Sequence, residues 1–199
     1  PIGYTNLYTT MEILTGGTIN WTEVGGSTVG AELSYSLNDG DWTALPTGST
    51  INVSAGDKVR FKGTNPSYAN LLSNDAGCTF SGSTSTFNLY GNIMSLIYGD
   101  DFDGQTSVSS AYTFQNMFAA TSVVNAENLV LVKGTVQKNS YALMFSNCTS
   151  PITTPNLPAT TLANYCYQSM FSGCSSLTVA PELHAMNLAN NCYESMFKG

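Results

Sequence analysis

The sequence predicts a mainly β, α+β chain: an antiparallel β-sandwich over residues 1–104, then a short repeat solenoid over residues 105–199. In the first half, short alternating apolar runs are separated by Gly and Asn turns at the intervals typical of a sandwich. In the second half, Met-Phe pairs recur at spacings of 27, 26 and 26 residues, which indicates stacked coils. The pairs begin at Met117, Met144, Met170 and Met196.

Two hairpins are predicted in the first half. In LSYSLNDGDWTALP, apolar residues alternate with polar ones over residues 33–37, and an Asn-Asp-Gly turn follows. INVSAGDKVRFKG, residues 51–63, shows the same pattern of alternating apolar residues on both sides of a turn, with Ala-Gly as the turn. The junction between the halves is expected in GNIMSLIYGDDF, residues 91–102. Further strands are predicted over Met11–Leu14, Thr18–Trp21, Cys78–Ser81 and Thr86–Leu89.

Each coil of the second half is expected to contain one strand and one short helix. Leu162, Cys166 and Met170 follow an i, i+4, i+8 spacing, and Gly173 stands where such a helix would stop. LTVAPEL, residues 177–183, is short and contains Pro, so we expect a brief parallel strand there. Positions that recur are apolar and positions that vary are polar, which is the pattern of coils that bury one face against the next coil.

The segment LPATTLANYCYQSMFSGCSSLTVAPEL resembles the BspA-like leucine-rich-repeat proteins, which are found on the surface of gut and oral Bacteroidetes and related microbes. It carries a Met-Phe-x-x-Cys-x-x-Leu turn in place of the commoner Ala-Phe version. The resemblance covers residues 112–199, and the first coil departs from it with VLVKGTVQKNS. It implies secretion, surface display and adhesion, and it implies no particular ligand.

Composition narrows the possible partners. Only 10% of the residues are charged and the net charge is -7, which argues against binding to nucleic acid or to anionic lipid. No apolar run approaches the roughly 20 residues of a membrane helix. The chain begins at Pro1 without a basic and apolar leader, so we expect a signal peptide to have been removed and the protein to be extracellular.

No constellation of residues indicates an enzyme, a metal or a cofactor. His184 stands at the repeat position of Pro158, so it is expected to be a surface substitution. Asp101 and Asp103 are a weak calcium candidate, because the calcium loop pattern also needs a third oxygen ligand and a downstream Glu. We interpret this segment as a solvated turn between domains.

Five cysteines leave at least one thiol without a disulfide partner. Cys148 and Cys174 occupy equivalent positions in adjacent coils, as do Cys166 and Cys192. Adjacent coils are close enough for disulfides, but side chains in such a ladder point in parallel into the core. We therefore expect buried, reduced thiols and no zinc site.

Aromatic and basic residues of the first half offer a possible ligand surface. Trp21 and Trp42, with Tyr35 and Tyr68, could form a platform on which a sugar stacks, although a Trp beside a turn, such as Trp42, is more often a core residue of a sandwich. The run KVRFK, residues 58–62, places Lys58, Arg60 and Lys62 on one face of a strand. This face is either solvated or a site for an anionic partner.

The predicted function is that of a secreted or surface-displayed adhesion protein, which binds a protein or a host-surface ligand through its solenoid face. The variable polar positions Tyr165, Gln168 and Glu194 are candidate contacts there. The alternative is a glycan-binding module of a surface polysaccharide-using system. Because the last coil lacks a polar terminal turn, we also expect further coils after it or self-association through an uncovered end. That end would comprise Leu183, Leu188, Cys192 and Met196.

Overall fold

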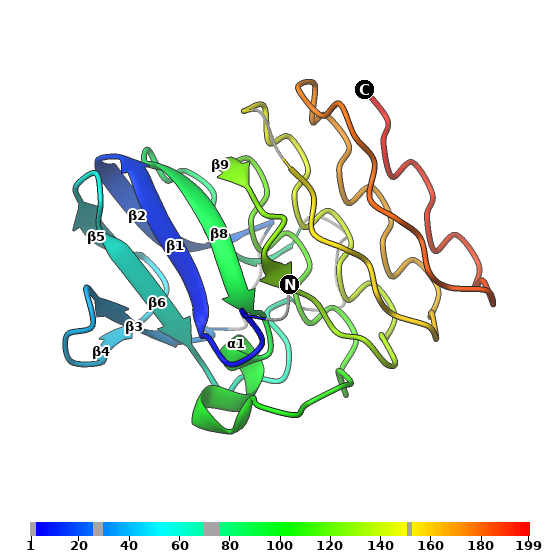
Figure 1. Cartoon of the computed structure of the whole chain (residues 1–199), viewed down its shortest axis with the longest axis horizontal. Coiled ribbons are helices and arrows are strands. Elements are labelled where there is room, and N and C mark those ends of the chain that lie inside the picture. Colours follow the sequence, from blue (N-terminus) through cyan, green and yellow to red (C-terminus); the bar gives the residue numbers. More distant parts are fainter. Residues whose placement is uncertain (1–2, 26–29, 70–75, 151–152) are drawn as a thin grey trace.

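The computed structural model describes residues 3–25, 30–69, 76–150 and 153–199, and it confirms a mainly β chain (Figure 1). The helical content of these residues is limited to α1 (Ser95–Tyr98) and the 3-10 turn η1 (Gly99–Asp101). The strands are β1 (Thr9–Thr15), β2 (Gly17–Val24), β3 (Leu33–Leu37), β4 (Thr43–Leu45), β5 (Ser49–Val53), β6 (Lys58–Lys62), β7 (Gly77–Thr79), β8 (Thr86–Asn92), β9 (Ser122–Asn125) and β10 (Leu129–Val130).

The larger of two sheets has the strand order β10-β8-β1-β6-β3-β4, with β9 also paired to β8. Its β3–β4 unit is the first predicted hairpin, which is confirmed. Asn38 and Asp39 have φ angles of 50° and 61° there, and the Gly40 N–H donates to the Leu37 carbonyl at 2.9 Å. Two successive positive φ angles match the right-handed twist of the strands that such a turn joins.

The second predicted hairpin is wrong in its pairing, although both of its strands form. β5 pairs with β2 in the smaller sheet, whereas β6 pairs with β1 and β3 in the larger one. The Ala-Gly turn therefore carries the chain from one sheet to the other. Local alternation predicts a strand from residues near in sequence, but the partner of that strand depends on which sheet buries its apolar face.

The two sheets enclose one apolar core. Trp21 of β2 contacts Phe80 with ring centroids 4.8 Å apart, and Phe80 contacts Phe61 of β6 at 4.9 Å. The Trp21 ring is fully buried, and its Nε1–H donates to the Ala31 carbonyl at 2.8 Å. This bond satisfies the one polar group that the ring brings into the core.

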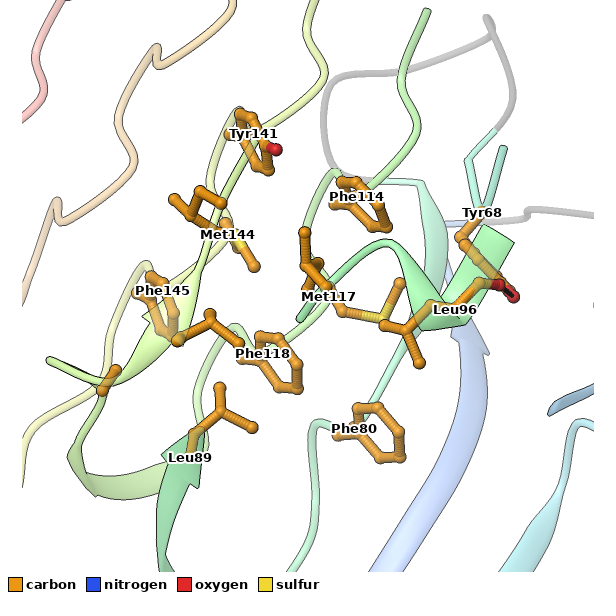
Figure 2. Close-up of a cluster of buried hydrophobic side chains, with 14 of the residues drawn as sticks. Tyr68, Phe80, Leu89, Leu96, Phe114, Met117, Phe118, Tyr141, Met144 and Phe145 are labelled. Atoms are coloured by element: carbon orange, nitrogen blue, oxygen red, sulfur yellow. Dashed lines mark hydrogen bonds between the residues drawn. The ribbon is translucent and has the colours of Figure 1, made fainter. Parts of the chain in front are cut away.

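The main-chain hydrogen bonding continues across the predicted boundary near residue 104. β9 and β10 come from the second half, and both pair in parallel with β8. The core is continuous as well, because Phe80 stacks on Phe118 at 5.5 Å with nearly parallel rings (Figure 2). The first sheet and the first coil are therefore joined by both backbone and side-chain contacts.

The second half consists of coils whose backbones pair with one another. Every second residue in a turn segment donates its N–H to the next coil, as Tyr141 does to Cys166 at 2.9 Å and Phe145 to Met170 at 2.9 Å. The residues between them close tight turns within their own coil, as Met170 does to Tyr167 at 3.3 Å. We call these segments the turn ladder. They are residues 112–120, 139–147, 165–173 and 191–198.

The helix predicted over residues 162–173 is wrong, because these residues belong to the turn ladder. Tyr165, Ser169 and Gly173 have φ angles of 61°, 52° and 74°, and a left-handed residue at every fourth position is incompatible with an α-helix. The strand expected over residues 177–183 is reduced to a single parallel bridge between Leu157 and Leu183. The coils thus follow the predicted 26-residue period with a different local structure.

Side chains of equivalent residues stack along the coils. One column runs from Phe118 through Phe145, Phe171 and Phe197, with ring centroids 5.6 to 5.9 Å apart. A second column runs from Phe114 through Tyr141, Tyr167 and Tyr193, at 5.5 to 5.6 Å. Figure 2 shows the first members of both columns beside Met117 and Met144. Met144, Phe145, Met170 and Phe171 are all buried, as expected of apolar residues that recur from coil to coil.

All five cysteine thiols are free and buried, and for the four of the coils this is the outcome predicted from their equivalent positions. At the C-terminal end of the stack Leu183 and Leu188 are 48% and 66% exposed, whereas Cys192 and Met196 are buried by neighbours within the stack. The expected exposure at this end therefore holds for the leucines alone. None of the helices in the described part of the chain has the length and apolarity needed to cross a bilayer.

Candidate functional site

A groove of about 800 Å³ with a mixed polar and apolar lining crosses one face of the coils. We call it the coil groove and define it by Asn125 and Asn128 of the first coil, Thr154 and Asn156 of the second, and Thr178 and Glu182 of the third. Each coil reaches this face with the segment that follows its turn ladder. The coils stack in parallel, so a feature of one coil is repeated at the next.

Asn128, Asn156 and Glu182 form a column along the coil groove. Asn156 and Glu182 each precede a residue of the bridged pair Leu157 and Leu183. Asn128 follows Asn125 by three residues, as Asn156 follows Thr153, and Asn125 and Thr153 are bridged too. Equivalent positions in three coils therefore present two amides and a carboxylate in a row.

The amides of this column are available to a ligand. Within the described residues, the side chains of Asn88, Asn128 and Asn156 make no hydrogen bond, whereas the Asn125 carboxamide oxygen accepts from the Glu127 N–H at 2.8 Å. Each free carboxamide offers two N–H donors and one acceptor oxygen. The coil groove can therefore both donate and accept hydrogen bonds along its length.

The groove continues onto the outer face of the larger sheet. A second depression of about 310 Å³, the sheet depression, shares Asn88, Asn125 and Asn128 with the coil groove and adds Tyr4 and Tyr90. β9 lies beside β8 (Figure 1), and the parallel pairing of β9 and β10 with β8 brings the residues that line both depressions together. Because successive residues of a strand face opposite ways, Asn88 and Tyr90 point outward while Phe87 and Leu89 enter the core.

The segment that carries Tyr4 is held against β8. Asn92 donates its Nδ2–H to the Thr5 carbonyl at 2.9 Å and its N–H to the Leu7 carbonyl at 2.8 Å. Gly91 has a φ of 91°, and a side chain there would collide with the Tyr8 carbonyl. Tyr4 consequently meets Tyr90 edge to face, with centroids 5.4 Å apart.

Carboxylates dominate the charge of this surface. Glu127 and Glu182 line the coil groove, and Glu12 lines the sheet depression beside Lys58, 3.7 Å away. Burial raises the pKa of the Tyr90 hydroxyl, and the nearby Glu12 carboxylate adds to that shift. Tyr90 therefore keeps its proton and stays a hydrogen-bond donor at neutral pH.

The predicted sugar-stacking platform is wrong for two of its four rings, those of Trp21 and Tyr68. Trp21 and Tyr68 are both fully buried, and their rings lie 5.6 Å apart in the core. The Tyr68 hydroxyl donates to the Leu96 carbonyl. A ring that binds sugar must expose a face, so Trp21 is not a ligand-binding residue. Strand alternation points Trp21 into the core on the same side as Ile19. The sequence pattern alone did not decide which face of the strand is buried.

Trp42 lies half-exposed on the outer face of the larger sheet, away from Trp21. The Lys62 ammonium sits 4.4 Å from its ring centroid and the Arg60 guanidinium 5.5 Å from it. Tyr8 meets the same ring edge to face at 4.9 Å. The predicted basic face is therefore occupied by an internal network, which includes the Lys62–Asp100 ion pair at 2.8 Å.

Asp100 anchors this network, and its neighbours Asp101 and Asp103 remain exposed. Hydrogen bonds from Lys62 and then from Tyr8 lower the pKa of the Asp100 carboxyl. Asp101 and Asp103 belong to no group of three His, Cys, Asp or Glu side chains that could hold a metal ion, because none occurs among the described residues. His184 lies on the surface, 3.6 Å from Glu182.

The candidate contacts Tyr165, Gln168 and Glu194 lie on the turn ladder, a different part of the coil from the coil groove. The Gln168 Nε2–H donates to the Glu194 carboxylate at 2.8 Å, so the structure brings these two together across adjacent coils. Tyr165 is half-exposed near them. None of the three lines the coil groove or the sheet depression.

A scan against models of protein families finds no match for this chain, and searches of curated proteins and of solved structures find none either. The candidate site therefore depends on the geometry above. Taken singly, its Asn and Thr residues carried no signal in the sequence, because each is an ordinary surface residue. The one available signal was the recurrence of Asn before an apolar pair, in ENLVL and PNLPA.

Proposed function

We propose that this chain is the ligand-binding part of a secreted or surface-displayed interaction protein and that it binds without chemical turnover. The single observation that carries this proposal is the coil groove, which crosses three coils and presents free amides. A surface built from stacked coils grows with each coil and suits an extended partner. The lining combines Asn, Thr, Ser and Glu with a few small apolar residues.

The proposed organisation is a β-sandwich over residues 1–104 followed by a solenoid over residues 105–199. The two facing sheets support the first assignment. The regular main-chain hydrogen bonds between successive coils support the second. The Met-Phe repeat supports membership of the BspA-like leucine-rich-repeat class, in a form where the turn ladder stands in place of a helix. Extracellular display and adhesion follow from that class.

The experiment is a binding assay with a matched pair of variants. Thr178→Arg places a long cationic side chain in the coil groove, and Thr160→Arg places one at an exposed threonine outside it. Labelled chain would be added to intact epithelial and bacterial cells and measured by flow cytometry. We expect Thr178→Arg to lower cell binding about tenfold and Thr160→Arg to leave it unchanged. Equal binding by both variants and the unmodified chain would overturn the proposal.

A further inference from the structure

We infer that the ligand of the coil groove is a neutral oligosaccharide chain, which extends from the coils onto the sheet depression. This inference rests on the proposed function and specifies its ligand. It arises because the two depressions share Asn88, Asn125 and Asn128, so a single elongated molecule can occupy both. The coil groove also lies within the size range of pockets that hold small ligands, roughly 300 to 1,000 Å³.

The polar chemistry of the surface matches sugar hydroxyls. A hydroxyl both donates and accepts, and so does the free carboxamide of Asn88, Asn128 or Asn156. The exposed hydroxyls of Thr153 and Thr178 have the same dual capacity. Because the amides have no partner within the described residues, the ligand need not break a protein hydrogen bond in order to form its own.

Charge excludes acidic ligands. Glu127 and Glu182 in the coil groove and Glu12 in the sheet depression face the same space as a single Lys58, which already pairs with Glu12. An acidic polysaccharide, a phosphate-bearing chain or an acidic peptide would meet net negative charge, in a chain whose net charge is -7. A neutral ligand avoids this repulsion.

The residue types that line the coil groove also favour a sugar over a folded protein as the ligand. Protein interfaces obtain most of their binding free energy from a few buried Trp, Tyr and Arg anchors. Among the described residues that line the coil groove, none is of these types, and the largest apolar side chains are Val124 and Val179. Small apolar groups beside amides and hydroxyls fit a ring that carries both C–H and O–H groups.

The sheet depression supplies the aromatic surface that the coil groove lacks. Tyr90 is half-exposed, and its edge-to-face contact with Tyr4 leaves it braced against the sheet. A sugar ring that reaches this end can place its C–H face against the Tyr90 ring and still hydrogen bond to its hydroxyl. We therefore expect affinity to rise with chain length until the oligosaccharide spans both depressions.

The test is affinity electrophoresis of the whole chain in gels that contain soluble α-glucan, mixed-linkage β-glucan, mannan or xylan, with polygalacturonate and heparin as acidic comparisons. At least one neutral polysaccharide should retard the chain, and neither acidic one should. The variant Asn128→Ala/Asn156→Ala should bind about tenfold or more weakly, the expected loss for two hydrogen bonds. Asn52→Ala/Asn190→Ala removes two exposed amides outside the groove and should bind normally.

Calorimetry with oligosaccharides of increasing length then tests Tyr90. The variant Tyr90→Ala should remove the gain that longer oligomers show and leave the affinity for the shortest binders unchanged. An unaltered melting temperature of each variant shows that the loss is local. Retardation that survives Asn128→Ala/Asn156→Ala, or that Trp42→Ala abolishes, would overturn the inference.

The failures of the two proposals differ in their pattern. If no neutral polysaccharide retards the chain but Thr178→Arg still abolishes cell binding, the coil groove binds another class of ligand and the oligosaccharide assignment is wrong. If cell binding is insensitive to Thr178→Arg, the coil groove is not the binding surface and both proposals are wrong.

Discussion

Replacing Met170 by Ala should destabilise the chain strongly, because Met170 lies in a coil with neighbours on both sides. Its side chain is fully buried. The adjacent coils are held at a fixed spacing by main-chain hydrogen bonds, such as Phe145 to Met170 and Phe171 to Met196, both 2.9 Å. The cavity left by truncation therefore cannot close. Buried Met-to-Ala changes cost about 2 to 5 kcal/mol, and we expect a value of about 3 to 5 kcal/mol here.

The assay is urea unfolding followed by circular dichroism. With a slope of roughly 2 to 3 kcal/mol/M, this loss moves the midpoint down by roughly 1 to 2.5 M. Met186 provides the matched control, since it is 92% exposed and Met186→Ala should change the free energy of unfolding by less than about 0.5 kcal/mol. A Met170→Ala midpoint equal to that of the unmodified chain would place Met170 on the surface and refute the stacking register.

Three further predictions concern single groups. Tyr68→Phe leaves the Leu96 carbonyl without its donor, so the free energy of unfolding should fall by about 1 to 3 kcal/mol in urea titrations, and an unchanged value would contradict the contact. The hydrogen bond from Lys62 lowers the pKa of Asp100, so its stabilising effect is present above pH 3.8 and is lost as pH falls through the lowered pKa. Asp100→Asn should then be slightly less stable than the unmodified chain at pH 7, the difference should shrink as pH falls below 3.8, and a difference that grows in acid would contradict the sign. Burial raises the pKa of the Cys166 thiol to about 12, so a thiol reagent at pH 8 should label it only after unfolding, and rapid labelling of the native chain would contradict its burial.

The sequence predicted the strands of the first half because their burial alternates. The hairpin that begins with residues 33–37 could be predicted because the strand alternates and Asn38 and Asp39 favour the positive φ angles of its turn. The strand pair at residues 51–63 does not, because β5 and β6 each find a partner elsewhere. An Ala-Gly turn is compatible with both a hairpin and a crossing between sheets, so its residues cannot select between them.

The error over the helix has a definite physical origin. A turn ladder returns to the same orientation every four residues, so it buries Cys166 and Met170 with the spacing of a helix, and Leu162, just before the ladder, is partly buried at the same interval. The distinguishing signal lies in the other positions. Gly173 and Asn147 stand at left-handed positions of the ladder, and such residues recur there because they tolerate a positive φ.

The candidate site could not be predicted from the sequence, because its residues are far apart along the chain. Asn88 and Asn128 are separated by 40 residues and meet only because β9 and β10 extend the sheet beside β8. The aromatic residues Trp21 and Trp42 were the more conspicuous candidates. Trp21 is a core residue, and Trp42 is covered in part by Lys62.

The most direct test of the account is to observe the asparagine side chains while ligand is added. The carboxamide signals of Asn88, Asn128 and Asn156 can be assigned in a ¹⁵N-labelled chain by single substitutions. Titration with the neutral oligosaccharide that binds best should shift these three signals together and leave the Trp42 indole signal in place. Shifts confined to the Trp42 indole, or to Gln168 on the turn ladder, would show that the ligand binds elsewhere and would contradict the account.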